Sequence, residues 1–169
     1  KGQGVATLIN KSSSFHCLSQ VTDPEGRFII VHGRWGAKSI TFASIYAPNF
    51  EDPLMIQNFF LKLAQYPSQW IIGGDFNCPL ETAMDKSSAT RTIPSQMARA
   101  IQASMLLENI LMENWALGLP TGKDYSFYSP PHKIFSRIDM IMLPGSCLDC
   151  VASTSIGYRL LQSRSCFNL

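Results

Sequence analysis

Hydrophobic positions in the first half of the chain form short runs that are separated by turn residues. The runs span residues 4–10, 15–21, 27–33 and 39–48. Asp-Pro-Glu-Gly at 23–26 and Arg-Trp-Gly-Ala-Lys at 34–38 supply turns between the later runs. Runs of this length bounded by Gly, Pro and Asp are typical of β-strands. The pattern therefore predicts three or four consecutive strands.

A helical pattern follows over residues 51–66. Asp52 can cap a helix, and Pro53 suits its first turn. The apolar residues that fall on one face of this helix are Met55, Phe59, Phe60 and Leu63. We therefore expect a helix that packs on the sheet formed by the preceding strands.

The second half of the chain alternates between strand and helix patterns. Residues 69–75 have the pattern of a fully buried strand, because apolar side chains occupy both faces. Residues 81–92 are polar and irregular, whereas residues 93–112 return to helical spacing. Two further strands are expected over 125–129 and 135–143, around a loop between them. Together these patterns predict an α/β layered sandwich.

The composition indicates one domain. A chain of 169 residues with 46% apolar residues can build one substantial core. Its net charge is +2 and 15% of its residues are charged, so a contact with nucleic acid has to come from a local patch. No apolar run reaches the length of a membrane helix, and residues 1–10 lack the apolar centre of a signal peptide. We expect an intracellular chain, nuclear or cytoplasmic, that is monomeric and does not bind a membrane.

The cysteines do not form a disulfide framework. They are Cys17, Cys78, Cys147, Cys150 and Cys166, an odd number at scattered positions. Cys147 and Cys150 form a C-x-x-C pair, but no second pair or nearby histidine completes a zinc site. Free thiols in a reducing compartment are therefore expected.

Asp75 and Asn77 follow the predicted buried strand in the segment Trp-Ile-Ile-Gly-Gly-Asp-Phe-Asn. Functional groups in α/β sheets collect at the carboxyl ends of strands. Residues i and i+2 of an extended segment point the same way, so this carboxylate and amide can face one small volume while Phe76 turns into the core. The carboxylate can take a proton from water or bind a hard cation, and the amide can donate to a phosphate oxygen. The pair suits hydrolysis of an anionic ester, although these are also ordinary turn residues that can satisfy their own backbone.

Two other predicted strands carry candidate groups. Tyr46 and Asn49 lie at the end of the run 39–48, and a tyrosine hydroxyl can donate to a phosphate oxygen. The alternative for Tyr46 is an amphipathic residue at a strand end. Asp139 interrupts the apolar run 138–142, where a buried carboxylate is costly unless it has a partner. We expect that partner to be a histidine or an amide.

Three segments in order resemble the endonuclease domain of non-LTR (LINE-type) retrotransposons. They are Ser-Ile-Tyr-Ala-Pro-Asn at 44–49, Gly-Gly-Asp-Phe-Asn-Cys-Pro-Leu at 73–80, and residues 125–143. That domain belongs to the endonuclease/exonuclease/phosphatase superfamily, with exonuclease III and the apurinic/apyrimidinic endonucleases. The resemblance covers about residues 4–160. It implies a four-layered α/β sandwich of the DNase I type, phosphodiesterase chemistry with Mg²⁺ as the cofactor, and DNA as the partner.

The resemblance also implies a role for each matching residue. Asp75 would orient or deprotonate the attacking water, while Asn77 and Tyr46 would hold the scissile phosphate. Asp139 would orient a catalytic histidine and stabilise its charged form. The hairpin over 125–136 would contact DNA. The candidate substrate contacts are Asn49, Ser126, His132, Lys133, Ser136 and Arg137.

The match to the family is incomplete at both ends. Family members begin with a strand carrying an asparagine and then a metal-binding glutamate, whereas Lys1 already lies past both. They end in Ser-Asp-His, whereas this chain reads Gln-Ser-Arg-Ser-Cys-Phe-Asn-Leu over 162–169. We therefore expect a partial domain over 1–161 that lacks N-terminal and C-terminal strands, followed by a divergent tail. The metal ligands are unknown, because the family's Glu and Asp ligands have no match.

None of the three histidines, His16, His32 and His132, is a credible substitute for the family histidine. His16 lies in an early strand, His32 ends a strand before a glycine turn, and His132 belongs to the hairpin. Without a histidine partner, we expect Asp139 to be protonated, hydrated or exposed.

Two functions of different classes remain open. One is a metal-dependent nuclease domain that nicks DNA. The other is an inactive relic that at most binds nucleic acid weakly, and it is the expected state of this chain because loss of the histidine and the metal ligands removes most of the rate. Phosphatases and deadenylases of the same superfamily share the core motifs, so they are a further alternative for the substrate.

Overall fold

The chain folds into a mixed arrangement of strands and helices. The computed structural model describes residues 4–88, 93–107, 125–144 and 146–147. In chain order the elements are β1 (Phe15–Thr22), β2 (Phe28–Trp35), β3 (Lys38–Tyr46), α1 (Pro53–Leu63), β4 (Gln69–Asp75), α2 (Thr82–Asp85), α3 (Gln96–Leu107), β5 (Phe127–Ser129), β6 (Ile134–Ser136) and β7 (Asp139–Met142). The α/β fold class predicted from the sequence is confirmed.

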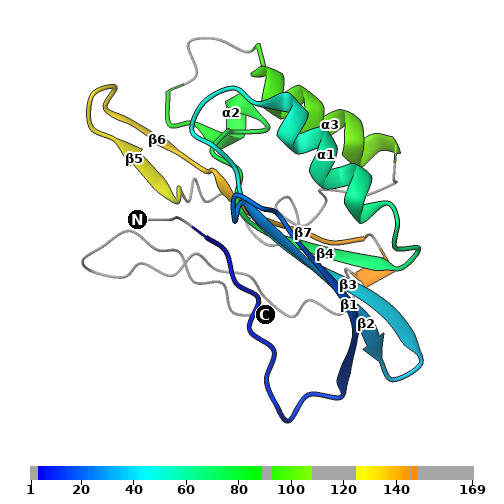
Figure 1. Ribbon diagram of the computed structural model, residues 1–169. Helices are drawn as coiled ribbons and strands as arrows, with labels where there is room; N and C mark the ends of the chain where they lie inside the picture. Colours follow the sequence, from blue (N-terminus) through cyan, green and yellow to red (C-terminus); the bar gives the residue numbers. More distant parts are fainter. Residues whose placement is uncertain (1–3, 89–92, 108–124, 145, 148–169) are drawn as a thin grey trace.

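Five of the strands form one sheet, in the order β1-β2-β3-β4-β7. β3 and β4 are parallel, and the other neighbours are antiparallel. Parallel neighbours need a crossover connection, and α1 supplies it between β3 and β4. β5 and β6 form a separate hairpin beside this sheet (Figure 1). The parallel arrangement brings the carboxyl ends of β3 and β4 to the same edge.

α1 and α3 cover one face of the sheet (Figure 1). Asp52 caps α1 by accepting a hydrogen bond from the Met55 N–H at 3.0 Å, and Pro53 opens the first turn. The buried side of α1 consists of Met55, Ile56, Phe59, Phe60 and Leu63. These side chains share one core with residues of the central strands, including Ile45 and Ile72. The cap, the proline and the apolar face predicted for this helix are confirmed.

Residues 4–10 do not form the strand that their apolar pattern predicted. They run along the face of the sheet opposite α1 and α3 (Figure 1), and Leu8 is 94% exposed. The Thr7 hydroxyl hydrogen-bonds the Ser44 hydroxyl on β3 at 2.9 Å. A new strand needs an open edge, but β3 lies in the middle of the sheet between β2 and β4. The segment therefore lies against the face of the sheet instead of extending its hydrogen-bond ladder.

Three other predicted boundaries differ from the structure. β2 continues to Trp35, so His32 lies within the strand and not at its end. The stretch 81–92, predicted to be irregular, contains the short helix α2. The single strand predicted over 135–143 is divided into β6 and β7, which belong to different sheets, because the chain turns at the buried Arg137.

Some predictions fall on residues that the structure does not describe. These are the helical pattern beyond Leu107, the tail over 162–169, Cys150 and Cys166. Within the described ranges, Cys17, Cys78 and Cys147 are free thiols, as expected. None of the helices in those ranges combines the length and apolar character needed to cross a membrane.

Gly74 allows β3 and β4 to approach each other closely. Its φ is +148°, and a Cβ atom at this position would collide with the Ile45 carbonyl oxygen on β3. Gly73 has more room, because a Cβ atom there would lie 3.7 Å from the Ile141 side chain, an ordinary contact.

We predict that Gly74→Ala lowers the free energy of unfolding by about 1–3 kcal/mol, since the backbone of β3 cannot move without disturbing the sheet. The matched change Gly73→Ala is expected to cost less than about 1 kcal/mol. Urea denaturation of both variants measures the difference, and equal losses would contradict a close approach at Gly74.

Candidate active site

Tyr46, Asp75 and Asp139 form a row across three neighbouring strands. Tyr46 is the register partner of Asp75 at the ends of β3 and β4, and Asp75 is the partner of Asp139 at the start of β7. Side chains directly opposite one another in a sheet point to the same face. The adjacent residues Ile45 and Met140 are buried in the core with α1, so the row lies on the other face. The sheet therefore brings together three residues that the sequence indicated separately.

The two aspartates of this row form a close pair. The Phe76 N–H donates to the Ile138 carbonyl oxygen at 2.8 Å. This bond joins the residue after Asp75 to the residue before Asp139, which makes the aspartates a non-hydrogen-bonded antiparallel pair. Such pairs have Cα atoms about 4.5 Å apart and the closest side chains in a sheet. Two carboxyl groups therefore lie side by side.

The Asp75 carboxyl is more basic than an ordinary aspartate. Its pKa is raised from 3.8 to about 6. Burial is the largest cause, the hydrogen bond from the Asn77 backbone N–H opposes the rise, and the negative charge of Asp139 contributes to it. A group with this pKa is ionised at neutral pH but accepts a proton more readily than an exposed carboxylate. Asp75 is thus suited to take a proton from water.

Asn77 closes the turn after β4. Its backbone N–H donates to the Asp75 carboxylate at 2.8 Å, and its side-chain amide donates to the Ala47 carbonyl oxygen at 2.6 Å. Its φ of +50° is left-handed, so the segment is not extended as predicted, and asparagine tolerates this conformation. Phe76 turns into the core, as expected. The hydrogen bonds within this turn satisfy its own backbone. They also hold the Asn77 side-chain amide next to Asp75, and the second N–H of that amide can donate to another group.

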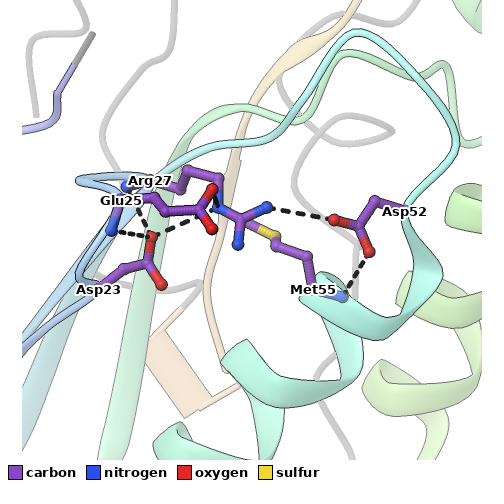
Figure 2. Close-up of polar contacts among 5 residues, drawn as sticks. All are labelled: Asp23, Glu25, Arg27, Asp52 and Met55. Atoms are coloured by element: carbon purple, nitrogen blue, oxygen red, sulfur yellow. Dashed lines mark hydrogen bonds and ion pairs between the residues drawn. The ribbon is translucent and has the colours of Figure 1, made fainter. Parts of the chain in front are cut away.

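Arg27 ties the turn between β1 and β2 to the start of α1 (Figure 2). Its Nε lies 3.3 Å from Asp23 and 3.4 Å from Glu25, and its Nη1 lies 3.1 Å from the capping residue Asp52. Its backbone carbonyl oxygen accepts a hydrogen bond from the Tyr46 N–H at 2.7 Å. The cluster therefore fixes the end of β3 that carries Tyr46.

The other predicted substrate contacts occupy several environments. His132 and Lys133 are exposed in the turn of the hairpin, where Lys133 has a φ of +51°. Asn49 is exposed in the loop before α1. Ser126 and Ser136 are half-buried at the base of the hairpin. A contact of each with phosphate stays a prediction.

Arg137 does not suit the phosphate contact predicted for it. The residue is 6% exposed, and its Nε and Nη2 donate to one Asp85 carboxylate oxygen at 2.8 and 2.5 Å. The other Asp85 oxygen accepts from the backbone N–H groups of Leu80 and Glu81 at 3.0 and 2.8 Å. This buried ion pair therefore holds the turn after Asn77 against the place where the chain passes from β6 to β7.

The sequence interpretation missed both Arg27 and Asp85. Asp85 lies in a polar stretch and its partner Arg137 is 52 residues away, so no local pattern indicates that it is buried. Arg27 had a signal, because Asp-Pro-Glu-Gly-Arg can form a turn in which the aspartate accepts nearby N–H groups. Asp23 accepts such bonds from the backbone of Glu25 and Arg27, each at 3.1 Å.

The histidines lie away from the row of Tyr46, Asp75 and Asp139. His16 is exposed on β1, and His132 is in the hairpin turn. His32 stacks on Tyr66 with ring centroids 4.8 Å apart, and its Nδ1 lies 2.9 Å from the Thr41 hydroxyl. His32 is therefore a satisfied packing residue, as the sequence suggested.

The two carboxylates suit part of a magnesium site. In the ranges that the structure describes, no three His, Cys, Asp or Glu side chains cluster in a way that could hold a metal ion. Asp75 and Asp139 nevertheless supply two neighbouring hard oxygen ligands. Mg²⁺ commonly binds through one or two carboxylates and takes its other ligands from water and substrate phosphate. The donor set therefore fits a largely hydrated Mg²⁺.

We predict that Asp75→Asn stabilises the fold at neutral pH. The pKa of Asp75 is about 6 in the folded chain against an ordinary value of 3.8, so the folded state binds more protons in this window and stability falls as the pH rises through it. Asparagine removes the charge and keeps an oxygen that can accept the Asn77 N–H. The expected gain is about 1–2 kcal/mol at neutral pH, less than the full shift because solvent screens part of the charge.

Urea denaturation of Asp75→Asn and the wild-type chain at several pH values measures this gain. The gain should shrink as the pH falls toward 3.8. If the variant were less stable than the wild type at neutral pH, burial of the Asp75 charge would not destabilise the fold.

Solved structures of phosphoester-cleaving enzymes share this fold, although no family model matches the sequence. The endonuclease domain of TRAS1, a telomere-specific non-LTR retrotransposon, has a TM-score of 0.57 and 16% identity over 82% of this chain and 61% of that chain. The AP endonuclease LMAP from Leishmania major has a TM-score of 0.61 and 18% identity over 80% of this chain and 51% of that chain. The 3′ phosphatase NExo from Neisseria, bound to a product DNA hairpin, has a TM-score of 0.59 and 13% identity over 84% of this chain and 64% of that chain.

These likenesses show that the chain shares the fold of the three proteins. The chain spans less than two thirds of the length of each of these three proteins.

Proposed function

We propose that this chain hydrolyses phosphodiester bonds in DNA, with Asp75 as the base that activates water. The observation that carries the proposal is the row of Tyr46, Asp75 and Asp139 on one face of the sheet. Burial and a neighbouring negative charge make Asp75 basic enough for this task. An aspartate that only closed a turn would need neither burial nor a neighbouring negative charge.

The other residues of the site would hold the phosphate. Asn77 keeps a second amide N–H that can donate to a phosphate oxygen while the first binds the Ala47 carbonyl. Tyr46, next to Asp75 in register, can donate its hydroxyl to the same group. Both donors are neutral groups, so they can hydrogen-bond the phosphate without adding negative charge beside it.

Magnesium is the proposed cofactor. Asp139 would hold it through its carboxylate, and it would supply a positive charge that stabilises the developing negative charge on the phosphate. Asp75 would remain the base and would not be a ligand of the ion.

DNA is the proposed substrate because the hairpin β5–β6 presents suitable groups to solvent. Lys133 is exposed in its turn and can meet a phosphate. Tyr128 and Phe135 are 44% and 47% exposed, with ring centroids 4.6 Å apart. Aromatic faces of this kind can stack on nucleobases. The known structures with DNA-related activities have the same fold, which supports this choice.

A second candidate function is DNA binding without cleavage. It is favoured by the finding that no cluster of three metal-type ligands occurs in the described part of the chain. Lys133, Tyr128 and Phe135 of the hairpin would then bind DNA without any part played by Asp75.

Two measurements on the wild-type chain separate these candidates. Conversion of supercoiled plasmid to the nicked form in Mg²⁺, abolished by a chelator, is the expected result. Binding to a labelled duplex without nicking would favour the second candidate. A chain that neither binds nor nicks DNA would contradict both.

A further inference from the structure

The chain changes sheets between β6 and β7. Ser136 is the last residue of β6, which pairs with β5, and Asp139 is the first residue of β7, which pairs with β4. Backbone N–H groups at such a change leave the regular ladder and need other acceptors. The Asp139 N–H points away from β4, because Asp75 and Asp139 form a non-hydrogen-bonded pair.

Asp85 and Ser126 supply the missing acceptors. The Arg137 N–H donates to the Asp85 carbonyl oxygen at 2.8 Å. Ser126 Oγ accepts from the Ile138 N–H at 3.1 Å and from the Asp139 N–H at 3.2 Å. A hydroxyl oxygen has two acceptor lone pairs, so these bonds use both of them. Ser126 is itself anchored, because its backbone N–H donates at 3.1 Å to the carbonyl oxygen at the end of β6.

We propose that Ser126 is a positioning residue for Asp139, and through Asp139 for Asp75. Its hydroxyl oxygen fixes the Asp139 backbone at the point where the two carboxyl groups lie side by side. The inference rests on the proposed function of Asp75 as the base. It replaces the direct contact with DNA phosphate that the sequence suggested for Ser126.

Loss of the Ser126 oxygen should loosen the start of β7. β7 has four residues, and in the part of the chain that the structure describes it pairs with β4 alone, so its first residue depends strongly on this anchor. The Asp139 backbone would move relative to Asp75, and water would enter between the carboxyl groups. Both changes disturb the side-by-side placement of the two carboxyl groups on which the proposed reaction depends.

Ser126→Ala and Ser126→Thr test this proposal in the full chain. Threonine keeps the hydroxyl oxygen that alanine removes. Ser129→Ala, at the end of the nearby strand β5, is the control for a serine outside the change of sheets. Hydrogen exchange of the Ile138 and Asp139 amides, followed by NMR, should be at least about tenfold faster in Ser126→Ala than in the wild type, because these N–H groups lose their acceptor. Ser126→Thr and Ser129→Ala should keep the wild-type exchange rates.

The kinetics of plasmid nicking supply a second readout. Ser126→Ala should lower kcat about tenfold or more with KM unchanged, and Ser126→Thr should restore it. A raised KM with unchanged kcat would instead indicate a DNA contact and overturn the proposal. Unchanged hydrogen exchange of the Asp139 amide in Ser126→Ala would also overturn it.

Failure of the proposed nuclease function can be distinguished from failure of the proposal for Ser126. If the wild-type chain does not nick DNA, the hydrogen exchange of the Asp139 amide still decides whether Ser126 positions Asp139. If Ser126→Ala does not fold, Ser126→Cys takes its place, because a thiol is of similar size but accepts hydrogen bonds weakly.

Discussion

Asp75→Asn is expected to lower the rate of DNA nicking by about 100- to 10,000-fold, the range typical for loss of a general base. Asparagine has nearly the same shape and can still accept the Asn77 N–H, but it cannot take a proton from water. Because the same change is expected to stabilise the fold at neutral pH, the loss of rate cannot be ascribed to unfolding. Single-turnover conversion of supercoiled plasmid in Mg²⁺ measures the effect.

Glu81→Gln is the matched control for Asp75→Asn. It also removes one negative charge, from an exposed side chain in the turn after Asn77. We expect its nicking rate to stay within about twofold of the wild type, as is usual for an exposed side chain outside the site. An Asp75→Asn variant as active as this control would show that Asp75 is not the base.

Arg137→Met is expected to lower the free energy of unfolding by about 3–5 kcal/mol. The change leaves the Asp85 carboxylate, which is 3% exposed, without the guanidinium that contacts one of its oxygens. The remaining bonds to the Leu80 and Glu81 N–H groups reach only the other oxygen. Urea denaturation of the variant and the wild-type chain measures the loss.

The double variant Asp85→Asn with Arg137→Met is the control for this prediction. A neutral asparagine can still accept a backbone N–H, and no charge is left unpaired at this residue. We expect the double variant to be more stable than Arg137→Met alone by about 1–3 kcal/mol. If the double variant lost as much stability as Arg137→Met and Asp85→Asn lose separately when added together, the two side chains would not be coupled.

Two different signals in the sequence indicated the members of the row formed by Tyr46, Asp75 and Asp139. Tyr46 and Asp75 lie at the ends of apolar runs, and the structure shows that the carboxyl ends of these two parallel strands meet at one edge. Asp139 stood out as a carboxylate within an apolar strand.

The contacts that hold this row in place depend on residues far apart in sequence. Asp85 meets Arg137 across 52 residues, and Ser126 meets Asp139 across 13. The division of the predicted strand 135–143 follows from the first contact, because the buried Arg137 side chain turns the chain out of β6. Residues 4–10 failed as a strand for a similar reason, since apolar alternation cannot reveal whether a sheet edge is open. The sequence pattern thus predicts which side chains lie at the ends of strands, whereas contacts between residues far apart in the sequence hold those side chains in position.

The pH dependence of kcat/KM for plasmid nicking tests most directly whether Asp75 acts as the base. Because the base must be deprotonated, kcat/KM should fall about tenfold per pH unit below the pKa of Asp75 and should level off above it. That pKa is about 6 in the chain without a metal ion, and a bound Mg²⁺ beside Asp75 lowers it. A profile without any fall at acidic pH, or the same fall in Asp75→Asn, would contradict the assignment.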